Sequence, residues 1–327
     1  MLSDKAIVLC VLKVFQKYSD AEHPLSVSDI KKKLQDDFAL TVADRRTIYR
    51  AIDILNDSYF DYEISKYDQN TQGYYLIRNP EKDLEPSEIQ IISDAVCAFP
   101  FISARSSENI CSKLQEQLNV HEQKQIKNLS IFKSEIKTPN ANVFLNIELL
   151  DEAISKKIKV KFDYYKYGTD KKLHKRREEK YIVNPYGMVY CNEHYYLACI
   201  FNHSGILSLY RIDLIMNLEL TELNLDQVER NFSYKDAVKK AIYGFVGDTV
   251  NVTMLVSRSE IGHVIDKFGT EIQVSDFDSY RCRVRLKASK TGFEFWALQF
   301  LGSIEVLGPQ EVRQDIIEII RNNKYGI

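Results

Sequence analysis

Apolar residues recur with a helical period along the first 56 residues and with a strand period just after them. Ser26 followed by Asp29 is the capping pair typical of a helix start. The pattern predicts three helices and then two strands: a helix at 4–18, a helix that starts at Ser26, a helix that ends near Asn56, and strands at 60–66 and 73–78. Three helices followed by a hairpin predict a winged helix-turn-helix domain over residues 1–80.

The apolar spacing stays helical from 81 to about 140 and ends in a polar stretch around Pro139. We therefore predict a helical connector over residues 81–142. A helix up to about Ile158 then precedes a series of strand-like runs, at 159–165, 173–183, 186–190, 194–201 and 206–212. Short consecutive strands rich in tyrosine favour a small Sm-like or SH3-like β-barrel over residues 143–230, because closure removes exposed strand edges.

The last part of the chain alternates between strand and helix patterns. A helix near 233–246 precedes strand 250–256, helix 259–268, strand 271–275, strand 280–287, helix 292–300, strand 303–307 and helix 310–322. The order βαββαβ with a final helix is typical of a ferredoxin-like domain, here over residues 231–327. We thus expect an α+β multidomain protein.

Charge and composition narrow the function classes. The 327 residues carry 44 Lys and Arg against 46 Asp and Glu, so any binding to nucleic acid must be local. The six cysteines form no C-x-x-C pair, and no metal site or cofactor is expected. The motifs of phosphate-binding loops, dinucleotide folds and nucleophile elbows are absent from the sequence, so we expect no catalytic residues and no enzyme activity. The apolar runs are too short for a membrane span or a signal peptide, which predicts a cytoplasmic protein without a membrane partner.

The third predicted helix carries candidate DNA-binding residues on the face opposite its apolar stripe. The candidates are Arg45, Arg46, Thr47, Tyr49 and Arg50, with Lys66 from the predicted wing. The planar fork of arginine donates two hydrogen bonds to a guanine edge or to phosphate oxygens. The alternative is an ordinary solvated helix face, because residues 1–80 carry 11 Lys and Arg against 12 Asp and Glu.

A second candidate site is the basic run 171–180 with the aromatic residues that follow it. Arg177 belongs to this run, and His194 and Tyr196 lie in a later strand-like segment. Cations interleaved with aromatic rings can pair with phosphates while the rings stack on bases. The alternative is an exposed hairpin tip, with the tyrosines packed inside the barrel.

A third candidate site is the row Arg281, Arg283, Arg285 and Lys287. Strand period places all four cations on one face, where their mutual repulsion favours a bound anion. The alternative is a positively charged strand edge that discourages aggregation.

Several motifs together resemble the bacterial WYL-domain transcriptional regulators along nearly the whole chain. The segment from Ala43 to Leu55 resembles the recognition helix of that family, and 73–76 resembles the end of its wing. Three segments resemble the WYL core, with Tyr in place of Trp in the name-giving triplet: Val183-Asn184-Pro185-Tyr186, Tyr195-Tyr196-Leu197 and Tyr210-Arg211-Ile212-Asp213. Trp296 and residues 302–309 are similar to the C-terminal extension that accompanies this core.

The resemblance implies a homodimer that reads a double-stranded DNA operator through its amino-terminal domains. It also implies an effector site in the WYL and C-terminal domains, for a nucleic-acid fragment or a nucleotide in some members. The family pocket positions correspond to Tyr164, Tyr196, Arg211 and Arg177. The family commonly has an arginine directly after its Arg-x-Asp element, where this chain has Leu214.

Two other function classes remain open from the sequence. In one, the protein binds RNA or single-stranded DNA, or acts as an adaptor, through the barrel and the Arg281 row, without reading an operator. In the other, it is an enzyme acting on nucleotides, with acid and base residues brought together only in the folded chain.

Overall fold

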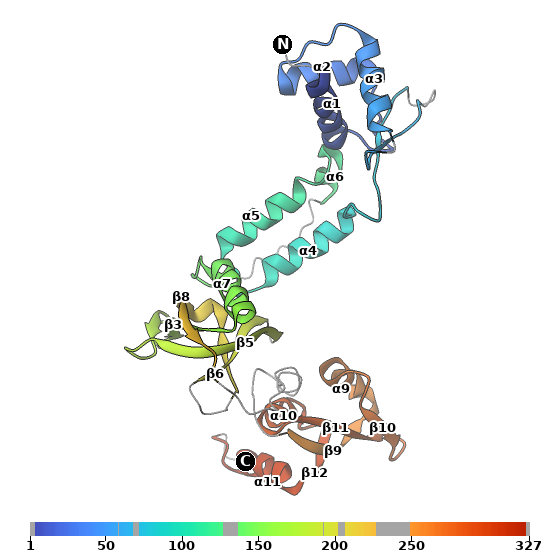
Figure 1. Ribbon diagram of the computed structural model, residues 1–327. Coiled ribbons are helices and arrows are strands. Elements are labelled where there is room, and N and C mark those ends of the chain that lie inside the picture. Colours follow the sequence, from blue (N-terminus) through green and yellow to red (C-terminus); the bar gives the residue numbers. More distant parts are fainter. Residues whose placement is uncertain are drawn as a thin grey trace. The chain divides into compact units, whose positions relative to one another are not determined.

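The computed structural model describes residues 4–57, 59–67, 72–126, 137–191, 193–201, 207–226 and 249–324. The chain divides into two compact units, Met1–Lys137 and Thr138–Ile327, and it combines helices with several separate sheets (Figure 1). The helix expected at 233–246 lies outside the described residues.

The first unit begins with three helices around a common core. They are α1 (Asp4–Tyr18), α2 (Val27–Phe38) and α3 (Arg45–Leu55). The predicted cap of α2 is present, since Ser26 Oγ accepts a hydrogen bond from Asp29 N and the Asp29 carboxylate accepts one from Ser26 N. Apolar side chains from all three helices fill the core, including Phe15, Leu34 and Ile48, each 0% exposed. The helical period of the sequence therefore placed this core correctly.

Two short strands follow, β1 (Glu63–Ile64) and β2 (Leu76–Ile77), which pair antiparallel. They are much shorter than the predicted strands at 60–66 and 73–78. Next to them, Ser65 N donates to Tyr75 O, but Tyr75 N donates to Ser65 Oγ and not to the Ser65 carbonyl. On its other edge, the second strand pairs with Leu25 through Tyr74, by two backbone hydrogen bonds of 2.7 and 2.9 Å. Gly73 permits this pairing, because a Cβ there would lie 2.9 Å from the Leu25 backbone.

Three more helices follow in the described part of the first unit: α4 (Pro86–Ala98), α5 (Ala104–Gln115) and α6 (Val120–Gln125). α4 and α5 pack against each other, as the helical period predicted (Figure 1). Within the described ranges, the helices are all too short or too polar to cross a bilayer.

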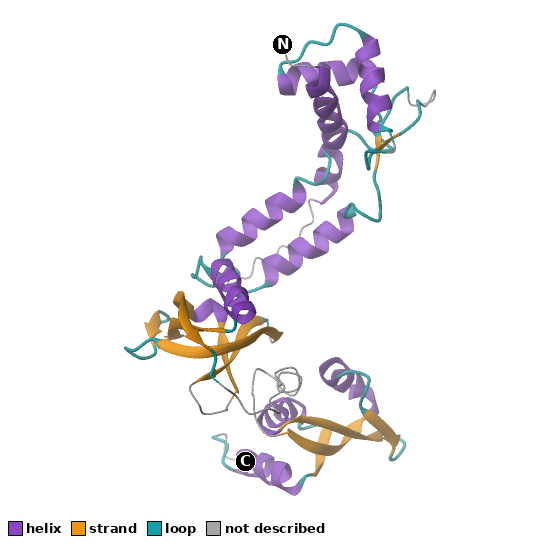
Figure 2. Ribbon diagram, viewed as in Figure 1, coloured by secondary structure: helices purple, strands orange, loops and turns teal. Residues whose placement is uncertain are grey.

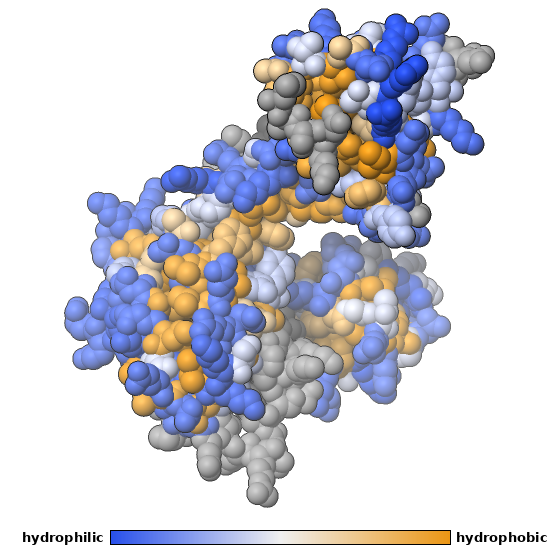
Figure 3. All heavy atoms as spheres, turned by 45° about the horizontal axis from the view of Figure 1, so that its top comes forward, coloured by the Kyte–Doolittle hydropathy of each residue, from blue (hydrophilic) through white to orange (hydrophobic). Residues whose placement is uncertain are grey.

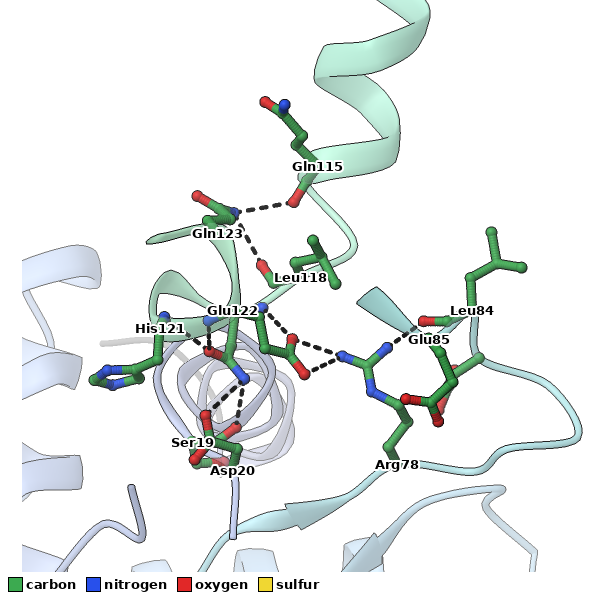
Figure 4. A network of polar contacts seen from close by, with 12 residues as sticks. Ser19, Asp20, Arg78, Leu84, Glu85, Gln115, Leu118, His121, Glu122 and Gln123 are labelled. Atoms are coloured by element: carbon green, nitrogen blue, oxygen red, sulfur yellow. Dashed lines mark hydrogen bonds and ion pairs between the residues drawn. The ribbon is translucent and has the colours of Figure 1, made fainter. Parts of the chain in front are cut away.

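A polar network attaches α6 to the helices and strands that precede the connector (Figure 4). Asn119, which caps α6, donates a hydrogen bond to the Ser19 carbonyl at the end of α1. Glu122 accepts two hydrogen bonds from Arg78 Nη2, at 2.7 and 2.6 Å, and one from Asn119 N at 3.0 Å. Arg78 follows β2, so the network holds the end of the hairpin against α6.

The second unit starts with α7 (Val143–Lys156), which packs on a six-stranded antiparallel sheet (Figure 2). The strands are β3 (Ile158–Tyr167), β4 (Leu173–Lys175), β5 (Tyr181–Cys191), β6 (His194–Phe201), β7 (Leu207–Arg211) and β8 (Ile215–Asn224). Their order is β4-β3-β5-β6-β7, and β8 pairs with β3.

Three expectations for this sheet need correction. The predicted strand 173–183 is two strands, β4 and the start of β5. A gap was expected before residue 186, but β5 continues through it, and its register with β6 shifts between Pro185 and Gly187. No strand was expected at 215–224, yet β8 lies there and pairs with β3 from Ile158 to Tyr164. The expected closed barrel is absent, because no pairing among the described residues joins β7 to β4 or β8.

The last part of the second unit is a four-stranded sheet with helices. It contains β9 (Thr249–Ser257), α9 (Ile261–Phe268), β10 (Gln273–Asp276), β11 (Arg281–Ser289), α10 (Lys290–Ala297), β12 (Ile304–Gly308) and α11 (Gln310–Arg321). The strand order is β10-β11-β9-β12, with antiparallel pairs. One face of the sheet packs on the helices around Phe293, 0% exposed, and Trp296, 2% exposed. Hydrophobic side chains also interrupt the hydrophilic surface of both units (Figure 3).

Candidate nucleic-acid and effector sites

The exposed face of α3 carries the predicted DNA-binding residues. Asp44 caps the helix by accepting a hydrogen bond from Arg46 N at 2.9 Å, and Ile48, Ala51, Ile52 and Leu55 are buried. The side chains of Arg45, Arg46 and Arg50 are exposed, Tyr49 is 42% exposed, and Thr47 is half-buried. Within the described part of the chain, the three guanidinium groups have no carboxylate partner.

The end of α3 holds the first hairpin strand in place. The Asn56 side chain donates to Ile64 O at 3.1 Å and accepts from Ile64 N at 2.5 Å. Lys66 comes two residues later and is exposed. Asn56 therefore fixes the position of β1, the strand that precedes Lys66, relative to α3.

Tyr74 lies close both to Tyr67 and to residues of α3. Its ring lies 5.3 Å from that of Tyr67. Burial raises the pKa of Tyr74, and the nearby Tyr49 and Asp53 of α3 add to the rise. The phenol stays neutral at physiological pH and can donate a hydrogen bond.

In the six-stranded sheet, Arg211 lies at the centre of the second candidate site. Its guanidinium binds the Asp213 carboxylate through two hydrogen bonds, Nε to Oδ1 at 3.1 Å and Nη2 to Oδ2 at 2.7 Å. Tyr164 Oη accepts a hydrogen bond from Arg211 N at 3.2 Å. Tyr196 is the register partner of Arg211 on the neighbouring strand. Sequence positions nearly fifty residues apart are thus brought together.

The aromatic residues of this site differ in their burial. Tyr164 packs edge-on against Tyr210, with ring centroids 4.9 Å apart, and burial raises the pKa of both phenols, that of Tyr210 to about 12. Burial also raises the pKa of the half-buried Tyr196, whose ring lies 6.3 Å from that of His194. Both Tyr164 and Tyr196 are therefore neutral hydrogen-bond donors.

Arg177 lies in the same sheet region but is already engaged. Its guanidinium sits 3.7 Å above the Tyr181 ring and 5.0 Å from that of Phe201. It also donates hydrogen bonds to the carbonyls of Glu179 and Lys180. These contacts make Arg177 a packing residue of the 176–180 turn.

Two asparagines missed by the sequence analysis hold the Arg211 turn. Asn140 Nδ2 donates to Asp213 O at 3.1 Å and to Ile215 O at 2.9 Å, and Asn146 Nδ2 also donates to Ile215 O. Both asparagines are 3% exposed. Leu214, in the position where the family commonly has arginine, is 7% exposed and belongs to the apolar interior.

The third candidate site is the outward face of β11. Cys282, Val284 and Leu286 are buried, and the cations between them point away from the helices, as strand period predicted. Arg281 is partly neutralised by Asp278, 2.9 Å away. Among the described residues, Arg283, Arg285 and Lys287 have no carboxylate partner, and the buried Nε of Arg283 has no hydrogen-bond acceptor.

The sequence was compared with known protein families and structures. A sequence model of the WYL domain matches residues 146–220, which hold the Arg211 site, and a model of the WCX domain matches residues 248–322, which hold the β11 row. The chain contains a WYL domain followed by a WCX domain. No curated protein matches this WYL-domain protein.

Two solved structures similar to the WYL-domain protein have low sequence identity. Proteasome accessory factor B/C (PafBC) of Arthrobacter aurescens is 13% identical over 97% of this chain, with a TM-score of 0.27. This chain covers 46% of that structure, less than half its length. A CRISPR Cas-related protein is 11% identical, with a TM-score of 0.35, over 98% of this chain and 85% of its own.

Proposed function

We propose that this WYL-domain protein is a DNA-binding transcriptional regulator. The exposed face of α3 carries the proposal, because its Arg45, Arg46 and Arg50 have no carboxylate partners among the residues that the structure describes. Residues 1–80 then act as a winged helix-turn-helix, in which α3 enters the major groove of an operator and Lys66 contacts the adjacent backbone. Residues 81–142 serve as a helical connector to the rest of the chain.

The effector site of the proposed regulator lies in the WYL domain, over residues 143–230. We assign it an anionic effector, of the class of a short single-stranded nucleic acid or a nucleotide. Arg211 supplies the charge, Tyr164 and Tyr196 supply hydrogen-bond donors, and His194 adds a ring beside Tyr196. We propose that this domain is related to the Sm-like barrels but is not closed.

The C-terminal domain, over residues 231–327, is proposed to be ferredoxin-like and to add to effector binding. Arg281, Arg283 and Arg285 are on its open sheet face. We further propose a cytoplasmic homodimer without enzyme activity, in which effector binding shifts the dimer between states of different operator affinity. Light scattering after gel filtration tests the dimer, and retention of an added nucleotide without turnover tests the absence of catalysis.

Fluorescence anisotropy on duplex DNA from upstream of the protein's own gene tests the proposal. We expect sequence-selective binding that weakens as salt rises, and a change in affinity when a short single-stranded oligonucleotide is added. Arg50→Ala should weaken binding, whereas Arg105→Ala on the exposed face of α5 removes the same charge and should not. Equal loss with both variants would refute α3 as the reader.

A second function is supported by the β11 face, where Arg285 and Lys287 are exposed and lack carboxylate partners among the described residues. In this alternative, the protein binds RNA or single-stranded DNA, or acts as an adaptor, without operator recognition. Arg285→Ala would then abolish binding to single strands while Arg50→Ala left it intact. The opposite pattern favours the regulator.

A further inference from the structure

Two thiols face each other inside the first unit. Cys97 is on α4 and Cys111 is on the neighbouring α5, and their Sγ atoms are 3.6 Å apart. Both residues are half-buried. A disulfide has an S–S length of about 2.05 Å, so the sulfurs need to approach by only about 1.5 Å. The structure describes all six cysteines, and no other two have their sulfur atoms in contact.

The surroundings hold the two helix segments close together. Lys137 Nζ donates hydrogen bonds to the carbonyls of Val96 and Phe99, at 3.0 and 2.8 Å, and to Ser107 Oγ of α5 at 3.0 Å. The Cys111 thiol donates to the Ser93 carbonyl across the helix pair, at 3.7 Å. Lys137 thus fastens α4 to α5 and places an ammonium charge near both thiols.

We propose that Cys97 and Cys111 are a redox-sensitive pair that forms an intramolecular disulfide on contact with a hydroperoxide. The Cys97 sulfur attacks the terminal oxygen of the hydroperoxide, and the O–O bond breaks. The leaving oxygen takes the Cys97 thiol proton and departs as water when the oxidant is hydrogen peroxide, which leaves a sulfenic acid on Cys97. The Cys111 sulfur then attacks the Cys97 sulfur, the S–O bond breaks, and the leaving hydroxide takes the Cys111 proton as a second water. The two thiols are oxidised by two electrons, and the peroxide is reduced.

The order of the two steps follows from the environment of Cys111. Burial and the neighbouring Cys97 thiol raise the pKa of Cys111 to about 11, so the Cys111 thiol stays protonated at neutral pH and is a poor first nucleophile. The product ties α4 to α5 near Lys137, the last residue of the first unit. The disulfide would therefore restrict motion in the helical connector. This inference does not depend on DNA binding.

Treatment of the reduced full-length protein with hydrogen peroxide tests the proposal. We expect the number of titratable thiols to fall from six to four, the intact mass to fall by two hydrogens, and peptide mapping to join the segments that contain Cys97 and Cys111. Dithiothreitol should restore all six thiols. The mapping uses the unchanged protein, so it does not depend on the folding of any variant.

Variants separate the roles of the two thiols. Cys10→Ser, a half-buried cysteine of α1, is the matched control and should still lose two thiols to the disulfide. Cys111→Ser should instead leave Cys97 as a sulfenic acid that dimedone traps. The proposal is overturned by an unchanged thiol count, a disulfide between two chains, a link between other cysteines, or a mass gain of oxygen in the unchanged protein.

Discussion

The Arg78–Glu122 pair allows a direct test of how the hairpin is attached to the connector (Figure 4). The side chains are 23% and 14% exposed, so both charges are largely removed from water. We predict that Glu122→Ala lowers the free energy of unfolding of the first unit by ~3 kcal/mol. Bonds to charged groups contribute about 1.5–3 kcal/mol each, and the lost acceptor for Asn119 N weakens the helix cap by ~1 kcal/mol. Water reaching the freed guanidinium of Arg78 offsets part of this loss.

Urea unfolding measured with two probes checks this magnitude. The single tryptophan, Trp296, is 2% exposed in the C-terminal sheet, so its fluorescence follows that sheet alone. Far-ultraviolet circular dichroism also follows the helices of the first unit. With a slope of roughly 2 kcal/mol per molar urea, ~3 kcal/mol lowers the midpoint of the helical transition by ~1.5 M. The Trp296 transition should stay in place.

The matched control is Glu116→Ala. Glu116 is an exposed residue directly after α5, and the loss of its side chain should change stability by less than about 0.5 kcal/mol. Glu122→Gln keeps an acceptor but loses the charge, and should fall between the two. The reasoning is refuted if Glu122→Ala and Glu116→Ala unfold at the same urea concentration, or if the Trp296 transition moves together with the helical one.

Three other predictions address the remaining sites. Arg50→Ala should reduce the slope of log affinity against log salt by ~1 if Arg50 contacts a phosphate, and Arg105→Ala should leave it unchanged. Arg211→Ala should lower the free energy of unfolding by ~3 kcal/mol, because Asp213 is 2% exposed and loses its cation, and adding Asp213→Asn should restore part of the loss. Burial raises the pKa of Glu294 to about 6 from 4.5, so stability is fully present below pH 4.5 and falls as pH rises through about 6. Glu294→Gln should remove this fall, up to ~2 kcal/mol, in thermal unfolding followed by Trp296 fluorescence.

Each of these predictions has an outcome that contradicts it. An unchanged salt slope together with unchanged base preference in Arg50→Ala would remove Arg50 from the interface. No recovery in the double variant would mean that Arg211 stabilises the sheet without Asp213. A pH profile of Glu294→Gln that still falls between pH 4.5 and 6 would place the titrating group elsewhere.

The sequence predicted those helices and strands in which buried residues repeat with a regular period on one face. The buried stripe of α3 and the alternation along β11 are such cases, because each is set by neighbours three, four or two positions away. The short hairpin was not predictable in this way. Its second strand also pairs, through Tyr74, with Leu25 almost fifty residues earlier, and no local period encodes that contact.

The candidate effector site shows the same division. The motif around Arg211 lies at the end of β7, and the register of Arg211 with Tyr196 follows from the strand pairing. The polar stretch around Pro139 predicted only a boundary, yet Asn140 within it binds the Asp213 carbonyl. Buried asparagine side chains that satisfy distant carbonyls carry no periodic signal, so only the folded chain reveals them.

The contacts of Arg211 limit how it can bind the proposed effector. Asp213 occupies Nε and one side of Nη2, whereas Nη1 has no acceptor among the described residues. An incoming anion therefore cannot use the full planar fork unless Asp213 yields, and Leu214 is buried and brings no second charge. A single charged contact discriminates weakly, so affinity must come largely from the hydroxyls of Tyr164 and Tyr196 and from ring stacking. This arrangement favours a base-containing effector over a bare inorganic anion.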